Sequence, residues 1–251
     1  MVFVSPVNDN SLHQHLFIQL TIGLSSEINI SFDGISKTAQ SVLINSNHAH
    51  QLNSCDKFSA VILIDTELEV ANLLRHTIFN KRDVYFPDFN LFKKHENELN
   101  RLSSGNVDMN SIENLVKSLI ASFGVNAPGS SSLKSRKIKN ILKILQDLPD
   151  DAFGVKRLAN EVDLSESRLT HLFKQEVGMP VRRYILWLRL QKAVIHIING
   201  SIFTDAAYFA GFADSAHLSR TFRKMFGQKM LVIFSSNSTS SPIMIKTSLI
   251  K

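Results

Sequence analysis

The sequence predicts an α+β protein, in which a small antiparallel β domain with helices precedes an all-α domain made of two similar units. Three observations predict this fold class. Apolar residues alternate with a period of two in segments up to about residue 66, and they then recur at helical spacing. A short sequence motif also occurs twice within the last hundred residues, and an internal repeat indicates a domain built from repeated structural units.

The first part of the chain has four segments with strand patterns. They span residues 15–22, 28–32, 41–45 and 58–64. The last of these is nearly all apolar, so we expect both of its faces to be buried. Asp33-Gly34 follows the second segment and suits the positive φ angles of a tight hairpin turn.

Two helices with apolar stripes are expected after residue 65. The first covers about residues 70–78, and the second has a cleaner stripe over residues 112–123. An apolar stripe needs a surface to cover it. Either this second helix covers the small sheet, or it pairs with its twin in a homodimer through residues 108–123.

Residues 124–135 contain Pro128-Gly129 and three consecutive serines, a composition typical of a flexible linker. Beyond it, helices are expected over about 138–145 and 155–162, then after Ser165, over 180–199, after Thr204 and after Asp214. Ser165, Thr204 and Asp214 are the predicted N-caps, because their side-chain oxygens can accept from free N–H groups of a first helical turn. Gly211 suits a left-handed turn between the last two helices.

The repeated sequence motif lies in the two predicted units of the all-α domain. It reads Leu169-Thr170-His171-Leu172-Phe173-Lys174 before Gly178, and Leu218-Ser219-Arg220-Thr221-Phe222-Arg223 before Gly227. Each copy forms a polar and basic helix after a shorter helix. Such a tandem is what a protein needs to read two successive major grooves of DNA, and the helix of about 30 Å between the units suits that spacing.

Charge is distributed unevenly along the 251 residues. Residues 134–229 hold 17 Lys and Arg against 9 Asp and Glu, a net of +8, whereas residues 1–133 hold 9 against 13, a net of −4. A surface that binds a polyanion is therefore expected in the all-α part. The alternative is that this basic surface is exposed to solvent and binds no polyanion, because charge alone does not identify a partner.

Cysteine content and hydropathy exclude some classes of protein. The single cysteine, Cys55, excludes an internal disulfide and a cysteine-based zinc cluster. The segment Met1-Val2-Phe3-Val4-Ser5-Pro6 has no basic start followed by an apolar stretch, and no apolar run approaches the roughly 20 residues of a membrane helix. We therefore expect a cytoplasmic protein without membrane association.

Two segments resemble the AraC/XylS family of bacterial transcription regulators. They are the stretch from Gly211 to Gly227, which reads GFADSAHLSRTFRKMFG, and the spacer segment Arg189-Leu190-Gln191-Lys192-Ala193. The family has two helix-turn-helix subdomains joined by a long helix, and the similarity covers about residues 134–230. Residues 13–66 have a weaker similarity to the cupin-like sensing domain of many members.

This resemblance implies a set of DNA contacts and partners. The contact positions would be Ser165, Ser167, Arg168, Thr170, His171 and Lys174 in the first unit, and Ser215, Ala216, His217, Ser219, Arg220, Arg223 and Lys224 in the second. Arg220 can offer a bidentate fork to guanine, whereas Arg223 and Lys224 are better placed for phosphates. The implied partners are double-stranded DNA, RNA polymerase and a small-molecule effector.

The chain departs from the family pattern at three places. His171 stands where the family usually has Arg, and Gly154 replaces a capping Thr or Ser. After Gly227 the chain continues with QKMLVIF and a Ser-rich stretch, in place of the family's short final helix. We therefore expect a disordered tail over 231–251 and a second unit that lacks its closing helix and is less stable.

Two His-x-His pairs stand in the β domain: His13 with His15, and His48 with His50. Alternation along a strand puts both members of a pair on one face, which a metal site needs. No acidic ligand is convincingly spaced nearby, so we expect these four histidines to line a ligand pocket, with no metal and no cofactor.

The sequence therefore predicts a sequence-specific, DNA-binding transcription regulator, an activator rather than an enzyme. We expect a cupin-like sensing or dimerising domain over 1–123, a linker over 124–135, a double helix-turn-helix domain over 136–230 and a tail over 231–251. One alternative is a metal-dependent cupin enzyme with an accessory helical domain. The other is a regulator impaired by its altered C-terminus.

Overall fold

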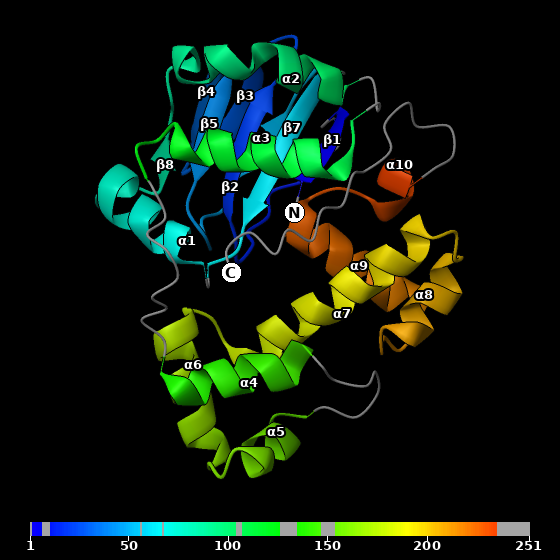
Figure 1. Ribbon diagram of the computed structural model, residues 1–251. Helices are drawn as coiled ribbons and strands as arrows, with labels where there is room; N and C mark the ends of the chain where they lie inside the picture. The colour runs from blue at the N-terminus through cyan, green and yellow to red at the C-terminus, as the bar shows by residue number, and fades with distance from the viewer. Residues whose placement is uncertain are drawn as a thin grey trace. The chain divides into compact units, whose positions relative to one another are not determined.

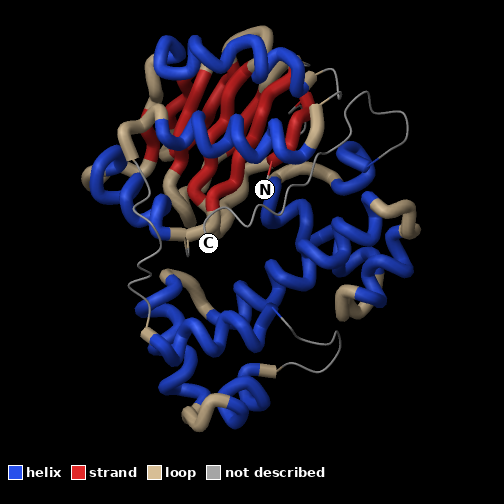
Figure 2. Tube along the Cα trace, viewed as in Figure 1, coloured by secondary structure: helices blue, strands red, loops and turns tan. Residues whose placement is uncertain are grey.

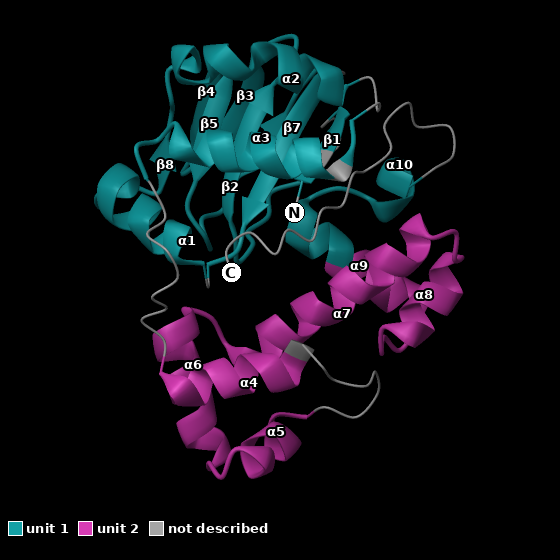
Figure 3. Ribbon diagram, in the orientation of Figure 1, with its two compact units in different colours: residues 1–131, 222–251 teal, residues 132–221 magenta. Residues whose placement is uncertain are grey.

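The structure is a computed structural model that describes residues 2–6, 11–55, 57–66, 68–103, 107–125, 135–146 and 154–234. It divides into two compact units (Figure 3). Unit 1 comprises residues 1–131 and 222–251, and unit 2 comprises residues 132–221. The division falls inside one continuous helix, α9.

Unit 1 contains two antiparallel sheets (Figure 1). The five-stranded sheet has the order β1-β7-β2-β5-β8, and the three-stranded sheet has the order β4-β3-β6. Their strands are β1 (Val2–Pro6), β2 (Ile18–Gly23), β3 (Ile28–Phe32), β4 (Ile35–Ala39), β5 (Ser41–Ile44), β6 (Gln51–Asn53), β7 (Phe58–Ile64) and β8 (Val84–Tyr85). The four strands expected from sequence are all present.

The larger sheet of unit 1 is covered on both faces, and Figure 2 shows a helix lying in front of the strands. One apolar cluster joins it to the smaller sheet and includes Ile28, Ile30, Val42 and Leu52. A larger cluster joins its opposite face to the helices of this unit. Every residue of β2 is consequently buried, including polar Gln19, because neither face of the central strand meets water.

The β3–β4 hairpin confirms the predicted turn, since Asp33 and Gly34 have φ angles of 49° and 73°. Strands β1, β4, β6 and β8 were not expected. Strand β1 ends at Pro6 and pairs with β7 only, and a proline is tolerated at a sheet edge because its missing N–H is not needed there. Strand β4 is almost wholly exposed, so its sequence lacks an apolar alternation.

The helices of unit 1 follow the strands along the chain. They are α1 (Glu69–Leu74), a π-helical turn (Arg75–Phe79), a 3-10 helix (Phe89–His95), α2 (Glu96–Leu102) and α3 (Met109–Ala121). The predicted helix over 70–78 is thus an α-helix that continues as a π-helical turn.

The apolar stripe of α3 was expected either to cover the sheet or to pair with its twin in a homodimer. Ile112, Val116 and Leu119 are at most 2% exposed and belong to the same core cluster as β2 and β7. Figure 1 shows α3 crossing the face of the sheet. The stripe covers the sheet within one chain, so the alternative of a homodimer through the stripe of residues 108–123 is wrong.

Unit 2 repeats one helical arrangement on either side of a long helix (Figure 1). Its helices are α4 (Arg136–Gln146), α5 (Val155–Glu161), α6 (Glu166–Val177), α7 (Val181–Ile198), α8 (Phe203–Phe209) and the first part of α9 (Ser215–Phe226). Helix α7 contacts α6 and α8. Ala206, Ala207 and Ala210 are buried, which confirms that small residues permit a close helix approach here.

The left-handed turn predicted at Gly211 is confirmed, and the glycines that follow α6 and α9 share its conformation. Gly178, Gly211 and Gly227 have φ angles of 83°, 73° and 72°, a conformation that glycine adopts without strain. The prediction of Thr204 as an N-cap is wrong. Helix α8 begins at Phe203, its N-cap is Ile202, two residues before the predicted one, and no side chain caps it.

The segment after Gly227 contains a short helix, α10 (Met230–Phe234). Met230 and Ile233 are 2% and 5% exposed, and the Phe234 ring lies edge-on to that of Phe222, with their centroids 5.9 Å apart. The expectation of a disordered tail is therefore wrong for residues 231–234, and so is that of an absent closing helix. Apolar residues at i and i+3 give one buried helical face.

Two predicted segments lie largely outside the described residues. They are the linker, of which residues 126–134 are not described, and the tail beyond residue 234. Among the helices that the structure describes, none combines the length and apolarity needed to cross a bilayer.

Replacing Ile233 by Ala should destabilise the packing of α10 by about 2 kcal/mol, because a buried Ile loses apolar contacts and leaves a cavity. The matched control is Val232→Ala in the same helix, since Val232 is 51% exposed and an exposed change stays within about 0.5 kcal/mol. Hydrogen exchange of the α9 and α10 amides measures both. Equal protection in the two variants would show that α10 does not pack as described.

Candidate nucleic-acid interface

Helix α6 presents a polar face opposite its buried face. Leu169 and Phe173 are 0% exposed and Val177 is 2% exposed, so the helix is fixed in rotation by its apolar side. The predicted contact residues lie away from that side. Ser165, Ser167, Arg168, His171 and Lys174 are exposed, and Thr170 is partly buried.

Two hydroxyl groups of this segment have structural roles. The Ser165 Oγ accepts a hydrogen bond of 3.2 Å from the backbone N–H of Arg168, which confirms the predicted N-cap. The Thr170 hydroxyl donates to the carbonyls of Glu166 and Ser167 within its own helix. The Ser165 hydroxyl can still donate a hydrogen bond to a ligand, whereas the Thr170 hydroxyl, whose hydrogen is already used, can only accept one.

Helix α9 repeats this arrangement. Leu218 and Phe222 are 0% exposed, and the Asp214 carboxylate accepts from the backbone N–H of His217, as its predicted cap requires. Of the expected contact residues, Ala216, Arg220, Arg223 and Lys224 are exposed, and Ser215, His217 and Ser219 are partly buried. The His217 ring lies edge-on to Phe212 with centroids 5.2 Å apart, so packing sets its position.

The cationic side chains of both helices are available to a ligand. Among the described residues, Arg168, Lys174, Arg220, Arg223 and Lys224 form no ion pair with a carboxylate. A cation without an internal partner gives up no protein contact when it meets a phosphate. Both helices can therefore contribute electrostatic affinity.

Helix α7 sets the spacing between the two motifs. Its 18 residues correspond to about 27 Å at the rise of an α-helix. The centres of successive major grooves on one face of DNA lie about 34 Å apart. A rigid helix of this length suits two reading helices placed one turn of DNA apart.

Helix α4 adds cations that were not singled out from sequence. Arg136, Lys137, Lys139 and Lys143 line an open depression of about 680 Å³ together with Asn140. On the other side of the helix Ile138, Ile141, Leu142 and Leu145 are buried. The sequence does contain a signal for this face. The apolar residues recur at helical spacing and the basic residues stand between them, so the basic residues are expected on the opposite side of the helix.

The four histidines of unit 1 fall into two groups. His13, His15 and His50 are buried, and one ring nitrogen from each lies within 4.8 Å of the others. Burial lowers the pKa of all three. The pKa of His15 falls to about 4, since the neighbouring His13 adds to the effect of burial, and that of His50 falls well below its usual value.

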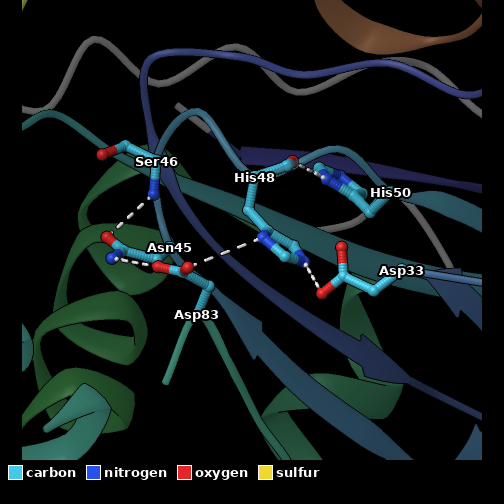
Figure 4. Close-up of polar contacts among 6 residues, drawn as sticks. All are labelled: Asp33, Asn45, Ser46, His48, His50 and Asp83. Atoms are coloured by element: carbon cyan, nitrogen blue, oxygen red, sulfur yellow. Dashed lines mark hydrogen bonds and ion pairs between the residues drawn. The ribbon is translucent and has the colours of Figure 1, made fainter. Parts of the chain in front are cut away.

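His48 lies apart from that group (Figure 4). Its Nε2 is 3.5 Å from Asp33 Oδ2 and its Nδ1 is 3.8 Å from Asp83 Oδ2. Both carboxylates are more than half exposed. The ring of His48 is directed to two carboxylates at the surface of the sheet and does not join the group of three. That the four histidines line a ligand pocket stays a prediction.

Comparison with known families and proteins concerns mainly the helical region. Residues 158–231 match a family model described as a helix-turn-helix domain. The transcriptional activator RhaS of Escherichia coli O157:H7 is 36% identical over 92 residues, which are 36% of this chain and 33% of that protein. The chain thus spans about a third of the length of the curated relatives it matches.

Solved structures resemble the chain over most of its length. ToxT of Vibrio cholerae O395 superposes with a TM-score of 0.56 and 12% identity, covering 92% of this chain and 95% of that one. A structure of ToxT from Vibrio cholerae strain SCE256 with a bound unsaturated fatty acid gives 0.52 and 15% identity, with 91% and 92% coverage. At this identity the likeness is one of fold, namely a β domain before a helical domain.

Removing the cap of α6 should loosen the start of that helix. Ser165→Ala is expected to cost about 1 kcal/mol, because the N–H of Arg168 loses its acceptor. Ser167→Ala is the control, since Ser167 lies in the first turn of the same helix and its side chain is exposed. Faster hydrogen exchange at the first α6 amides in Ser165→Ala alone is the expected result, and equal exchange in both variants would contradict the capping role.

Proposed function

We propose that the chain is an AraC/XylS-type helix-turn-helix protein and a sequence-specific DNA-binding regulator that activates transcription, which the helix-turn-helix match over residues 158–231 and the similarity to RhaS support. The observation that carries the proposal is the repeated geometry of α6 and α9. In each helix a buried apolar pair fixes the rotation, and unpaired cations lie on the free side. A solvated surface needs neither the repetition nor the spacing by α7.

Individual residues divide into base readers and phosphate contacts. We assign base reading to the middle of each helix, where Arg220 in α9 can donate two hydrogen bonds to guanine. The corresponding position in α6 is His171, which has fewer donors, so α9 is the more selective reader. Arg168, Lys174, Arg223 and Lys224 supply phosphate contacts, which fix the register of the protein on DNA.

The cationic face of α4 belongs to the same proposal. Lys137, Lys139 and Lys143 are exposed, and lysines act as point charges toward phosphate. Their contribution would be to affinity and not to sequence preference. This face extends the set of phosphate contacts beyond the two recognition helices.

Regulation and partners complete the proposal. RNA polymerase is the partner through which an activator acts, and unit 1 is the place for a small-molecule effector, which its fold-level likeness to ToxT supports. A cytoplasmic location follows from DNA as partner. The matched relatives are transcription regulators, which favours a regulator over an enzyme.

The impaired regulator is the second candidate that the structure bears on. Met230 and Ile233 of α10 are buried, so the chain does have a short helix after α9. This favours an intact second helix-turn-helix motif over an impaired one. Leu231 and Val232, which lie in the same helix, are exposed.

A gel-shift titration with DNA upstream of the chain's own gene tests the function. The control is a scrambled fragment of equal composition. At least four phosphate contacts imply that log Kobs falls with log salt at a slope of about −4. We expect tighter binding to the upstream fragment at every salt concentration, and equal binding to both fragments would contradict sequence-specific regulation.

Two variants separate readout from affinity. Arg220→Ala should relax the preference at one base pair and cost about 1–3 kcal/mol on specific DNA only, because a bidentate contact to one base is lost. Lys224→Ala should weaken specific and random DNA alike and reduce the salt slope by about one unit. Equal losses on both DNAs for Arg220→Ala would remove it from base reading.

A further inference from the structure

Three buried histidines of unit 1 converge from two segments of the chain. His13 and His15 precede β2, and His50 precedes β6. The backbones of His13 and His50 exchange two hydrogen bonds of 3.0 and 2.9 Å, so the segments are pinned together. The ring centroids are 4.4 Å apart for His13 and His50, 5.0 Å for His15 and His50, and 5.6 Å for His13 and His15.

Backbone carbonyls determine which ring nitrogens hold protons. His13 Nδ1 lies 2.9 Å from the carbonyl oxygen of Ser11, and His50 Nδ1 lies 2.9 Å from that of His48. A carbonyl oxygen only accepts, so each Nδ1 must donate. In the neutral ring the lone pair is then on Nε2, and a histidine that binds a metal is held in this way, with its other N–H on a carbonyl.

The lone pair of His50 has no partner. Its Nε2 is buried and makes no hydrogen bond to any described residue. Buried polar atoms are normally satisfied, and this one lies within a group of rings that offer further lone pairs. A bound cation would satisfy it.

His15 is held by a side chain as well as by the backbone. Its Nε2 donates across 2.6 Å to Gln19 Oε1, and the Gln19 amide nitrogen donates to the Thr21 hydroxyl. In the neutral ring the lone pair of His15 is then on Nδ1, which lies 3.2 Å from the carbonyl oxygen of Phe17.

We propose that His13, His15 and His50 form a site for one divalent ion of the zinc class, with a fourth coordination position open to water or a small ligand. Imidazole nitrogens suit Zn²⁺, Ni²⁺ and Cu²⁺, whereas Mg²⁺ and Ca²⁺ require oxygen ligands. Tetrahedral Zn²⁺ with Zn–N bonds of about 2.0–2.1 Å needs nitrogens about 3.3 Å apart. Ring rotations that draw the nitrogens in from within 4.8 Å complete the geometry.

The proposal is independent of DNA binding and assigns the four histidines unequal roles. His48 contributes its carbonyl to His50, while its ring contacts Asp33 and Asp83 (Figure 4). His48→Ala is therefore the matched control, because it removes a histidine from the same segment and leaves the three rings in place.

The experiment uses the full chain without an affinity tag, stripped of metal with EDTA and titrated with Zn²⁺ in a calorimeter. We expect one ion per chain and a higher Tm in its presence, because a ligand that binds only the folded state stabilises it. His50→Ala should weaken binding by more than about 100-fold, beyond the loss of an outer-shell partner. His48→Ala should bind as the wild type does.

Gln19→Ala, which removes the amide beside the His15 ring, should weaken binding by about 10–100-fold. If His50→Ala does not fold, as judged by circular dichroism, the ring ¹⁵N signals of the wild type decide. Zn²⁺ should shift those of His13, His15 and His50 and not that of His48. Absence of stoichiometric binding, equal weakening by His48→Ala, or a shift confined to other histidines would each overturn the proposal.

Discussion

Burial of Leu169 and Phe173 in α6, and of Leu218 and Phe222 in α9, fixes how each helix is rotated about its axis. The cost of turning these side chains to water is several kcal/mol per helix, far more than any single exposed contact could offset. The identity of the free face follows directly. Whatever stands between the buried positions, such as Arg168 or Arg220, must lie on the side where a ligand can reach it.

The same constraint explains why the repeat tolerates differences in its polar residues. His171 and Arg220 occupy comparable places, but neither contributes to the core, so a change there alters recognition without altering the fold. Caps behave differently. Ser165 and Asp214 satisfy backbone N–H groups at the helix starts, and they hold the end of each helix from which DNA would be approached.

Unit 1 depends on a related constraint, which is the coverage of its larger sheet on both faces. With no face left for water, polar side chains near β2 must find partners inside the protein. Gln19 does so with His15 and Thr21. The Nε2 of His50 does not, since it is buried and makes no hydrogen bond to any described residue.

Local patterns in the sequence predicted most of this structure. The stripe of α3, the Asp33-Gly34 hairpin and the caps of α6 and α9 depend on residues close along the chain, and all are present. Strand β1 could not be predicted, because its edge pairing with β7 joins distant segments. The separation of His48 from His50 depends likewise on the His13–His50 bridge. The burial of α10 was missed because the family pattern, and not the spacing of Met230 and Ile233, guided the expectation.

We propose that α7 holds α6 and α9 so that both enter major grooves on one face of the same DNA. Hydroxyl-radical footprinting of the bound upstream fragment measures this arrangement. We expect two protected windows about 10 base pairs apart, in phase with the helical turn. A single window, or two windows out of phase with that turn, would contradict it.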